Sequence, residues 1–217
     1  MLAEEGPKAL STRRLAAEVG TSTMAVYTHF GGKGDLVRAM VREGFSYLNR
    51  SLTEVAETAD PVADIGALGW AYRHNAQEHW HLYSVMFGGS VLSGFSLTDD
   101  DRQHGRYTLE TLVGAVARCM AADRLSPGDP QAVAHQLWIA LHGLVTLEFG
   151  GYLVPPYDAD ACFEAQVTGL LMGAAATRPA PSPRWRRHAN GGPEALSPRA
   201  RRLMVGQLFQ GAVGHQM

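Results

Sequence analysis

Hydroxyl, thioether and ring side chains are concentrated in one short stretch near the N-terminus, residues 23–29. Val26 and Phe30 are four residues apart, which is the spacing of one apolar face of a helix. The other faces would then carry Thr23, Met24, Tyr27, Thr28 and His29. Hydroxyl groups can hydrogen-bond with the edges of DNA bases, and a methionine side chain can contact the methyl group of thymine. These side chains could therefore recognise a groove of DNA through noncovalent contacts, without making or breaking a covalent bond.

Two short helices joined by a turn would hold these side chains in place. Leu15 and Val19 repeat the apolar spacing of four in an Ala-rich segment, and Gly20 follows where a left-handed C-terminal cap is expected. Ser22 is placed to cap the second helix, and the glycine pair at 31–32 ends it. Such narrow apolar stripes cannot stabilise either helix alone, so the pair must dock on the rest of the chain and leave its outer face free to enter a groove. The pattern predicts a helix-turn-helix.

The same segment resembles a known family. Residues 10–36 are similar to the DNA-reading segment of the TetR family of bacterial transcriptional regulators, in which Leu-Thr-x-Arg-x-Leu-Ala precedes Gly-Val-Ser-x-x-x-Leu-Tyr-x-His-Phe-x-x-Lys. The matching residues are Leu10, Arg13, Leu15, Ala16, Gly20, Ser22, Tyr27, His29, Phe30, Lys33 and Leu36. A matched run of this length rarely arises by chance.

The resemblance implies a DNA-binding role for a set of residues. The set is Thr12, Arg13, Ser22, Thr23, Met24, Ala25, Tyr27, Thr28, His29 and Lys33. Thr12 and Arg13 correspond to phosphate contacts of the family, as do Tyr27 and His29, and Lys33 corresponds to an anchoring lysine. The positions that correspond to base-edge contacts hold no Arg, Asn or Gln, so discrimination between bases would be weak or partly indirect. Two alternatives stay open: Thr12 could cap a solvated helix start, and Tyr27 could be a core aromatic.

The family's pattern also has a long helix before this segment, packed beneath the reading pair. Only residues 1–4 stand in its place here. We expect a start codon placed too far downstream, because Leu15, Val26 and Phe30 would otherwise lose partner surface at a cost of several kcal/mol. The alternative function is a helical small-molecule-binding protein whose DNA binding is lost or weakened.

Composition and charge describe an ordinary globular chain. The 217 residues are 46% apolar and 18% charged, with a formal net charge of −2. Residues 51–177 are acidic, whereas residues 1–50 are close to neutral and residues 178–217 are basic. An acidic body is repelled by phosphate, so only the N-terminal head would approach DNA.

The sequence also indicates the cellular compartment of the protein. Cys119 and Cys162 form no metal or redox motif, and the N-terminus has no signal-peptide pattern, which predicts a cytoplasmic protein. The apolar run at 137–154 includes His142 and Glu148. Ionisable groups are costly inside a membrane, so a buried helix is the better interpretation than a membrane span.

Apolar residues recur at helical spacing along the rest of the chain, and no segment alternates as a strand would. The expected helices cover about residues 36–52, 62–78, 79–87, 98–124, 131–149 and 160–176. We therefore expect an all-α fold. Its parts would be a helix-turn-helix domain at 1–50 with its first helix largely missing, a helical effector-binding and dimerisation domain at 51–177, and a mostly disordered Pro/Arg-rich tail at 178–217 with one short helix near 198–210.

The last two expected helices are candidates for a homodimer interface. In the TetR family they pack against those of a second subunit as a four-helix bundle. The residues that could do so here are Leu137, Ala140, Leu141, Leu144, Val167, Leu170, Leu171, Gly173 and Ala174. A dimer would set two reading helices one DNA turn apart on a palindromic operator. The alternative is a core helix in a monomer.

Aromatic, methionine and histidine side chains are candidates for an effector cavity, which the family encloses among its body helices. They are Trp70, His74, Trp80, Tyr83, Met86, Phe87, Trp138 and His142. Ordinary core packing is the alternative for each. Trp138-x-x-x-His142-Gly143 also resembles the C-terminal domain of one subgroup of the family. The prediction is a regulator, most often a repressor in this family, released from its operator by a small apolar effector.

Metal binding and catalysis find little support. His74, Glu78, His79 and His81 lack the spacing that brings ligands together on one helix. The sequence contains no nucleophile elbow either. We expect neither a metal, nor a cofactor, nor an enzyme.

Overall fold

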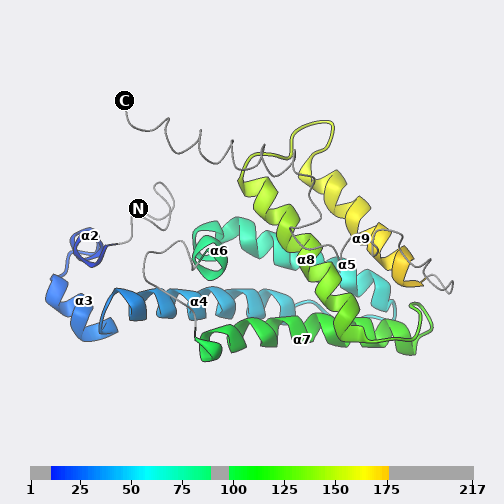
Figure 1. Cartoon of the computed structure of the whole chain (residues 1–217), viewed down its shortest axis with the longest axis horizontal. Helices are drawn as coiled ribbons and strands as arrows, with labels where there is room; N and C mark the ends of the chain where they lie inside the picture. The colour runs from blue at the N-terminus through cyan, green and yellow to red at the C-terminus, as the bar shows by residue number, and fades with distance from the viewer. Residues whose placement is uncertain (1–10, 89–97, 176–217) are drawn as a thin grey trace, which may run out of the picture. The chain divides into compact units, whose positions relative to one another are not determined.

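The structure is a computed structural model that describes residues 11–88 and 98–175. Within these two ranges the regular elements are α-helices and no strand occurs, which confirms the all-α prediction (Figure 1). The helices are α2 (Thr12–Glu18), α3 (Thr23–Phe30), α4 (Lys33–Thr53), α5 (Pro61–Glu78), α6 (Trp80–Phe87), α7 (Asp99–Ala121), α8 (Pro130–Phe149) and α9 (Ala159–Ala175). The expected tail at 178–217, with its helix near 198–210, lies outside the described residues.

Capping residues set several helix boundaries. Ser22 Oγ accepts a hydrogen bond at 3.0 Å from the amide three residues further on, so this serine caps α3 as the sequence predicts. Asp60 caps α5, and Pro61 occupies its first turn, where a missing amide hydrogen costs nothing. Thr98 and Asp101 form a capping box at the start of α7.

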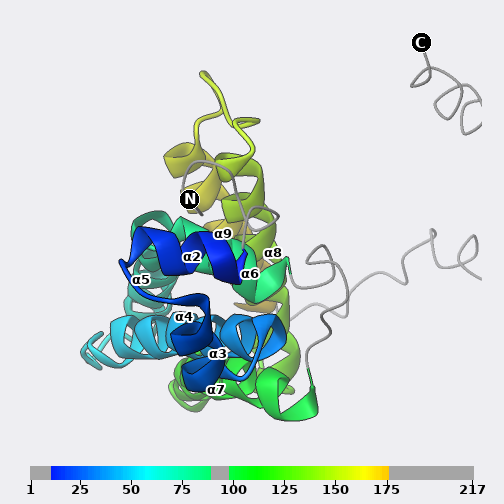
Figure 2. The same ribbon diagram turned by 90° about the vertical axis from the view of Figure 1, so that its left-hand side faces the viewer.

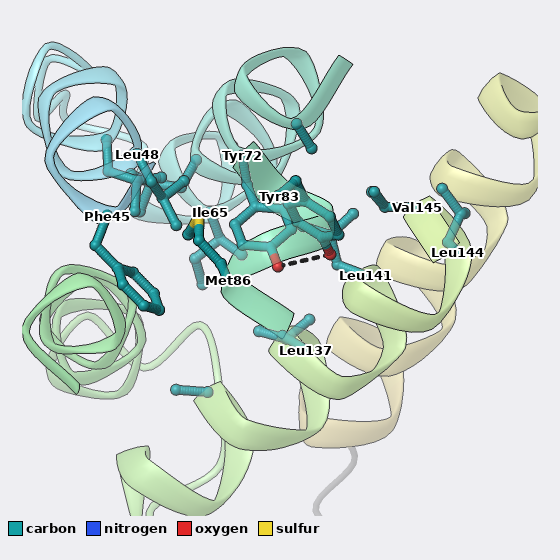
Figure 3. Close-up of a cluster of buried hydrophobic side chains, with 14 of the residues drawn as sticks. Phe45, Leu48, Ile65, Tyr72, Tyr83, Met86, Leu137, Leu141, Leu144 and Val145 are labelled. Atoms are coloured by element: carbon teal, nitrogen blue, oxygen red, sulfur yellow. Dashed lines mark hydrogen bonds between the residues drawn. The ribbon is translucent and has the colours of Figure 1, made fainter. Parts of the chain in front are cut away.

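Helices α4, α5, α6, α7 and α8 supply most of the main hydrophobic core (Figure 3). One valine from each of α4, α6, α7 and α8 is completely buried: Val41, Val85, Val116 and Val145. Helices α4 and α7 lie side by side (Figure 1). Gly105 permits this close approach, because a Cβ atom there would lie 3.1 Å from Cζ of Phe45. The long helix α4 therefore extends from α3 into the body and is packed on both α5 and α7.

Arg73 joins three helices through a partly buried ion cluster. Its Nε and Nη2 atoms donate to the two carboxylate oxygens of Glu148 on α8, each at 2.8 Å, and Nη1 donates to Asp160 on α9 at 2.6 Å. The Arg73 side chain is 5% exposed and the Glu148 side chain 20%. Hydrogen bonding from Arg73 is the main cause that holds the pKa of Glu148 below its usual value.

Replacing Arg73 with alanine should lower the free energy of unfolding at pH 7 by about 3 kcal/mol, because it leaves Glu148 without its cation in a partly buried site. The folded pKa of Glu148 is lowered, so this stabilisation is complete above the ordinary glutamate value and is lost as the pH falls through the folded value. Urea unfolding at pH 7 and at pH 3 measures the difference, which should shrink at the lower pH. His74→Ala on the exposed face of the same helix is the control, with an expected change within about 0.5 kcal/mol. Equal effects of the two substitutions would contradict the conclusion that Arg73 stabilises the fold through its contact with Glu148.

The apolar face of α8 is used by the chain's own core, which corrects part of the predicted dimer interface. Leu137, Leu141 and Leu144 are 6%, 8% and 5% exposed, so a second subunit cannot reach them. Their burial follows from docking of α8 on α5 and α7. None of the helices in the described ranges has the length and hydropathy needed to cross a bilayer.

The opposite faces of α8 and α9 are exposed and weakly charged. Ile139 and Leu147 on α8 are 62% and 47% exposed, and Met172 on α9 is 69% exposed. Gly143 and Gly169 lie on these helices with nothing near the position where a Cβ atom would be. Apolar side chains between small residues make a surface that another helix can approach closely.

Candidate nucleic-acid interface and internal cavities

Helices α2 and α3 form the predicted helix-turn-helix (Figure 2). Gly20 has a φ of +67°, the left-handed conformation that ends α2, and the next amide donates to the Ala16 carbonyl at 2.8 Å. The two helices bury only Ala16 and Val26 fully. Leu15 and Phe30 are partly buried against the core. Within the described residues the pair is thus anchored by a few apolar side chains, and most of its other side chains are exposed.

The outer face of α3 is exposed where base-edge contacts are predicted. Met24 is 73% exposed, and Ala25 and Thr28 are also exposed, while Thr23 is half-buried. Thr28 Oγ1 donates to the Met24 carbonyl at 2.9 Å, so its hydroxyl hydrogen is already used and its oxygen can only accept. Apolar contact and hydrogen-bond acceptance are the chemistry that remains available at this face.

The predicted phosphate contacts surround that face. Tyr27 is 47% exposed, so the alternative that it is a core aromatic does not hold. His29 and Lys33 are exposed, and Lys33 is the first residue of α4. These three side chains come from one short stretch of chain that includes the turn after α3.

At α2 the structure corrects the proposed cap. Ser11, not Thr12, is the N-cap residue: its side chain accepts from the Arg14 amide at 3.2 Å. Thr12 is half-buried and Arg13 is exposed at the start of the helix. The sequence interpretation missed Ser11, although a serine immediately before an apolar helix is a known start signal.

An acidic residue that sequence reasoning did not single out links α4 to α7. The Asp101 side chain is completely buried, and its Oδ2 atom accepts from the amide and the hydroxyl of Thr98 at 2.9 and 2.8 Å. Arg38 Nε lies 3.4 Å and Arg42 Nη2 lies 3.9 Å from its carboxylate oxygens. Burial raises the pKa of Asp101, but the Thr98 hydrogen bonds and the two arginines outweigh it, so the pKa is lowered overall.

Among the cavities between the body helices, two adjoin each other. The smaller, of about 60 Å³, is lined by Leu52, Ile65, Leu68, Gly69, Tyr72, Gly105, Thr108, Leu109, Leu112, Leu137, Trp138, Leu141 and Val167. The larger, of about 310 Å³, is lined by Phe45, Leu48, Met86, Phe87, Arg102, Gly105, Arg106, Thr108, Leu109, His135 and Trp138. The two share four lining residues and are therefore neighbours. Their walls are mostly apolar with a few polar groups, which is the usual composition of a small-molecule site.

Five of the eight predicted effector residues lie together at these cavities. Met86 and Phe87 line the larger cavity, and Trp138 lines both. Tyr83 and His142 form a hydrogen-bond chain with a tyrosine that lines the smaller cavity, as described below. The lining residues Arg102, Arg106 and His135 were not predicted, because their convergence depends on how α7 docks on α8.

The other three predicted effector residues lie elsewhere. Trp70 is 41% exposed and its ring packs on Phe163 with centroids 4.4 Å apart. The His74 side chain is 70% exposed and lies 3.3 Å from Glu78. Trp80 contacts the ring of His81 and lines neither cavity. The described residues contain no group of three or more potential ligands that could hold a metal ion.

The hydrogen-bond chain beside the cavities consists of two phenols and an imidazole. Tyr72 and Tyr83 hydroxyls are 3.0 Å apart (Figure 3), and Tyr83 Oη is 2.6 Å from Nδ1 of His142. Burial raises the pKa of Tyr72 to about 12 and also raises that of Tyr83. Burial lowers the pKa of His142. All three groups are therefore neutral near pH 7, and together they form a polar strip in an apolar wall.

An all-helical chain with an exposed helix-turn-helix and internal cavities has the architecture of a DNA-binding transcriptional regulator. Comparison with known proteins gives the family. Residues 1–40 match the family model for bacterial regulatory proteins of the tetR family, and residues 65–170 match the model for the tetracyclin repressor-like C-terminal domain. The chain belongs to the TetR family, whose members are transcriptional regulators and not enzymes. Its membership of the subgroup marked by Trp138, His142 and Gly143 stays a prediction.

Individual relatives agree with this assignment. An uncharacterized HTH-type transcriptional regulator of Mycobacterium tuberculosis is 28% identical over 172 residues, which are 79% of this chain and 75% of that protein. The HTH-type transcriptional repressor DrrR1 of Streptomyces coeruleorubidus is 38% identical over 81 residues, 36% of this chain and 26% of that protein.

Solved structures share the fold. A protein with unknown function from a Rhodococcus species has a TM-score of 0.69 and 29% identity, over 81% of this chain and 90% of that one. The TetR family regulator PfmR from Thermus thermophilus has a TM-score of 0.63 and 20% identity, over 79% and 92%.

Proposed function

We propose that the chain is a homodimeric repressor that binds a palindromic operator through α3 and leaves it when a small molecule occupies the body cavities. Residues 1–50 would be the DNA-binding domain, and residues 51–177 the effector-binding and dimerisation domain. The observation that carries the proposal is the course of α4. This helix begins three residues after α3, and its residues Phe45, Leu48 and Leu52 line the cavities. A shift of α4 would therefore act on both sites.

DNA binding is supported by the groups that α3 and its surroundings leave exposed. Tyr27, His29 and Lys33 offer a hydroxyl, an imidazole and an ammonium group to phosphates, and Met24 offers an apolar contact to a thymine methyl. None of these is a bidentate reader of bases. Most of the affinity would therefore come from phosphate contacts and would be sensitive to salt.

Dimerisation is supported by the exposed faces of α8 and α9. These faces carry Ile139, Leu147 and Met172 beside small residues, and the chain's own core does not need them. A two-fold interface would bring the same surface of each chain together as a four-helix bundle. We therefore propose these exposed residues as the interface in place of the buried leucines.

Ile139→Arg should convert the dimer to a monomer, because it places two charges close to the two-fold axis of an apolar interface. Sedimentation velocity at micromolar concentration measures the mass, and operator affinity should fall with it. Ala67→Arg on the exposed face of α5 is the matched control and should remain dimeric. A fully dimeric Ile139→Arg protein would exclude this face as the interface.

Release by an effector follows from differential binding to two conformers. A small molecule that fits the cavities better when α4 is displaced lowers operator affinity by the ratio of its affinities for the two conformers. The Asp101 contacts with Arg38 and Arg42, and the contact of Phe45 with Gly105, hold α4 against α7 at the larger cavity. These contacts would have to rearrange when the cavity expands.

Selection of binding sites from random DNA tests the proposal as a whole. The full chain should enrich a two-fold symmetric sequence, and the affinity for that sequence should fall steeply with salt. If no sequence is enriched, the chain is not an operator-binding regulator. The alternative of a helical small-molecule-binding protein would then account for the cavities.

A further inference from the structure

The larger cavity carries charge of a single sign. Among the described residues that line it, the ionisable ones are Arg102 and Arg106 on α7 and His135 on α8, and none is acidic. Arg102 and Arg106 are four residues apart, so they lie on the same face of the helix. Two like charges at this spacing repel each other. An anion bound between the two guanidinium groups would be attracted to both and would offset their repulsion.

Burial divides the cavity into a polar end and an apolar end. Arg102, Arg106 and His135 are exposed, whereas Phe45 and Met86 are 8% and 4% exposed. The basic groups therefore face solvent, and the apolar walls lie inside the body. A ligand that matches both ends has a charged head and an apolar body.

The basic groups are available to such a ligand. Within the described ranges Arg106 makes no ion pair, and Arg102 pairs with Asp99, whose side chain is 91% exposed. An exposed pair of this kind is weak and can be replaced at little cost. His135 Nδ1 lies 2.8 Å from the Gln131 carbonyl. A carbonyl oxygen can only accept, so Nδ1 carries the hydrogen, and Nε2 can donate to an anion when the imidazole is protonated on both nitrogens.

We propose that the larger cavity binds a small amphipathic anion, with its carboxylate or phosphate at Arg106, Arg102 and His135 and its apolar body against Phe45, Met86 and Trp138. This inference names the chemical class of the effector. Its part in releasing DNA rests on the proposed function. Trp138 and Leu109 also line the smaller cavity. An apolar chain long enough to pass Trp138 reaches that second space, so affinity should rise with chain length until it is filled.

Calorimetric titration of the full chain without DNA tests the ligand class. The probes are octanoate and octyl phosphate, with 1-octanol and octylamine as the neutral and cationic counterparts of the same chain length. At least one anion should bind on the order of tenfold or more tightly than 1-octanol, and octylamine should bind least. The two anions compared with each other identify the preferred head group. Equal affinity for octanoate, octyl phosphate and 1-octanol would overturn the proposal.

Substitution of Arg106 tests the position of the head group. Arg106→Gln should weaken anion binding on the order of tenfold and leave 1-octanol binding unchanged, and Arg106→Lys should restore part of the loss. Arg124→Gln, at an exposed position after α7, is the matched control and should bind like the wild type. Circular dichroism checks that each variant is folded. An Arg106→Gln protein with wild-type anion affinity would place the head group elsewhere and refute the site.

Operator release separates this inference from the proposed function. If an anion binds through Arg106 but leaves operator affinity unchanged, the ligand site stands and the regulatory role fails. If the chain binds an operator but shows no preference for the anions, the repressor stands and the ligand class is wrong.

Discussion

Lys33→Ala should weaken operator binding on the order of a hundredfold at physiological salt. Lys33 is exposed at the first residue of α4, directly beyond α3, and the proposed homodimer would present it twice. Each lost phosphate contact lowers affinity for all sequences and removes about one unit from the slope of log affinity against log salt. The slope should therefore fall by about two units for the dimer. Fluorescence anisotropy with the selected operator over a series of salt concentrations measures both quantities.

Arg50→Ala is the matched control for this prediction. Arg50 is also an exposed cation on α4, but it lies in the last turn of the helix, where α4 packs on the body. Its removal should leave the salt slope unchanged. If Lys33→Ala also leaves the slope unchanged, Lys33 does not contact phosphate and the reading head approaches DNA in another orientation.

The helix-turn-helix could be predicted because its determinants are local. Gly20 ends α2 with a left-handed residue, Ser22 caps α3, and Val26 faces inward, all within seven residues of chain. Asp60 with Pro61 and Thr98 with Asp101 mark two later helix starts in the same way. These signals involve residues that meet within one turn, so they can be interpreted without the rest of the fold.

The orientation of the body helices could not be predicted in the same way. Helix α8 is apolar on most of its circumference, so its sequence does not distinguish the face that packs on α5 and α7 from the face left exposed. Leu137 and Ile139 are both apolar, yet the first is 6% and the second 62% exposed. On α5, Trp70 and His74 were predicted as cavity residues from their residue types, but both are exposed.

The charged contacts between helices could not be predicted from the sequence either. Arg73 contacts Glu148 and Arg38 contacts Asp101, and the residues of each pair are far apart in the sequence. An arginine on a helix has the same local pattern whether it faces water or a buried carboxylate. Only the docking of the helices decides which pairs form and which cations are left at a cavity wall.

Asp101→Asn should lower the free energy of unfolding at pH 7 by about 2 kcal/mol. The substitution keeps an oxygen that can accept from Thr98, but it removes the buried charge that faces Arg38 and Arg42. The folded pKa of Asp101 is lowered, so its contribution is complete above the ordinary aspartate value and is lost as the pH falls through the folded value. Urea unfolding should therefore give the full difference at pH 7 and a much smaller one near pH 2.

Asp100→Asn provides the control for that prediction, because it removes a charge from the neighbouring residue of the same helical turn. The Asp100 side chain is 77% exposed and lies 3.9 Å from Arg42, so its loss should change stability by less than about 0.5 kcal/mol. A large difference between the two variants means that burial, and not the mere presence of an acid near Arg42, makes the contact between α4 and α7 strong. Equal effects would mean that Asp101 contributes only as a helix cap, and α4 would then be held against α7 by Phe45 and Gly105 without help from charge.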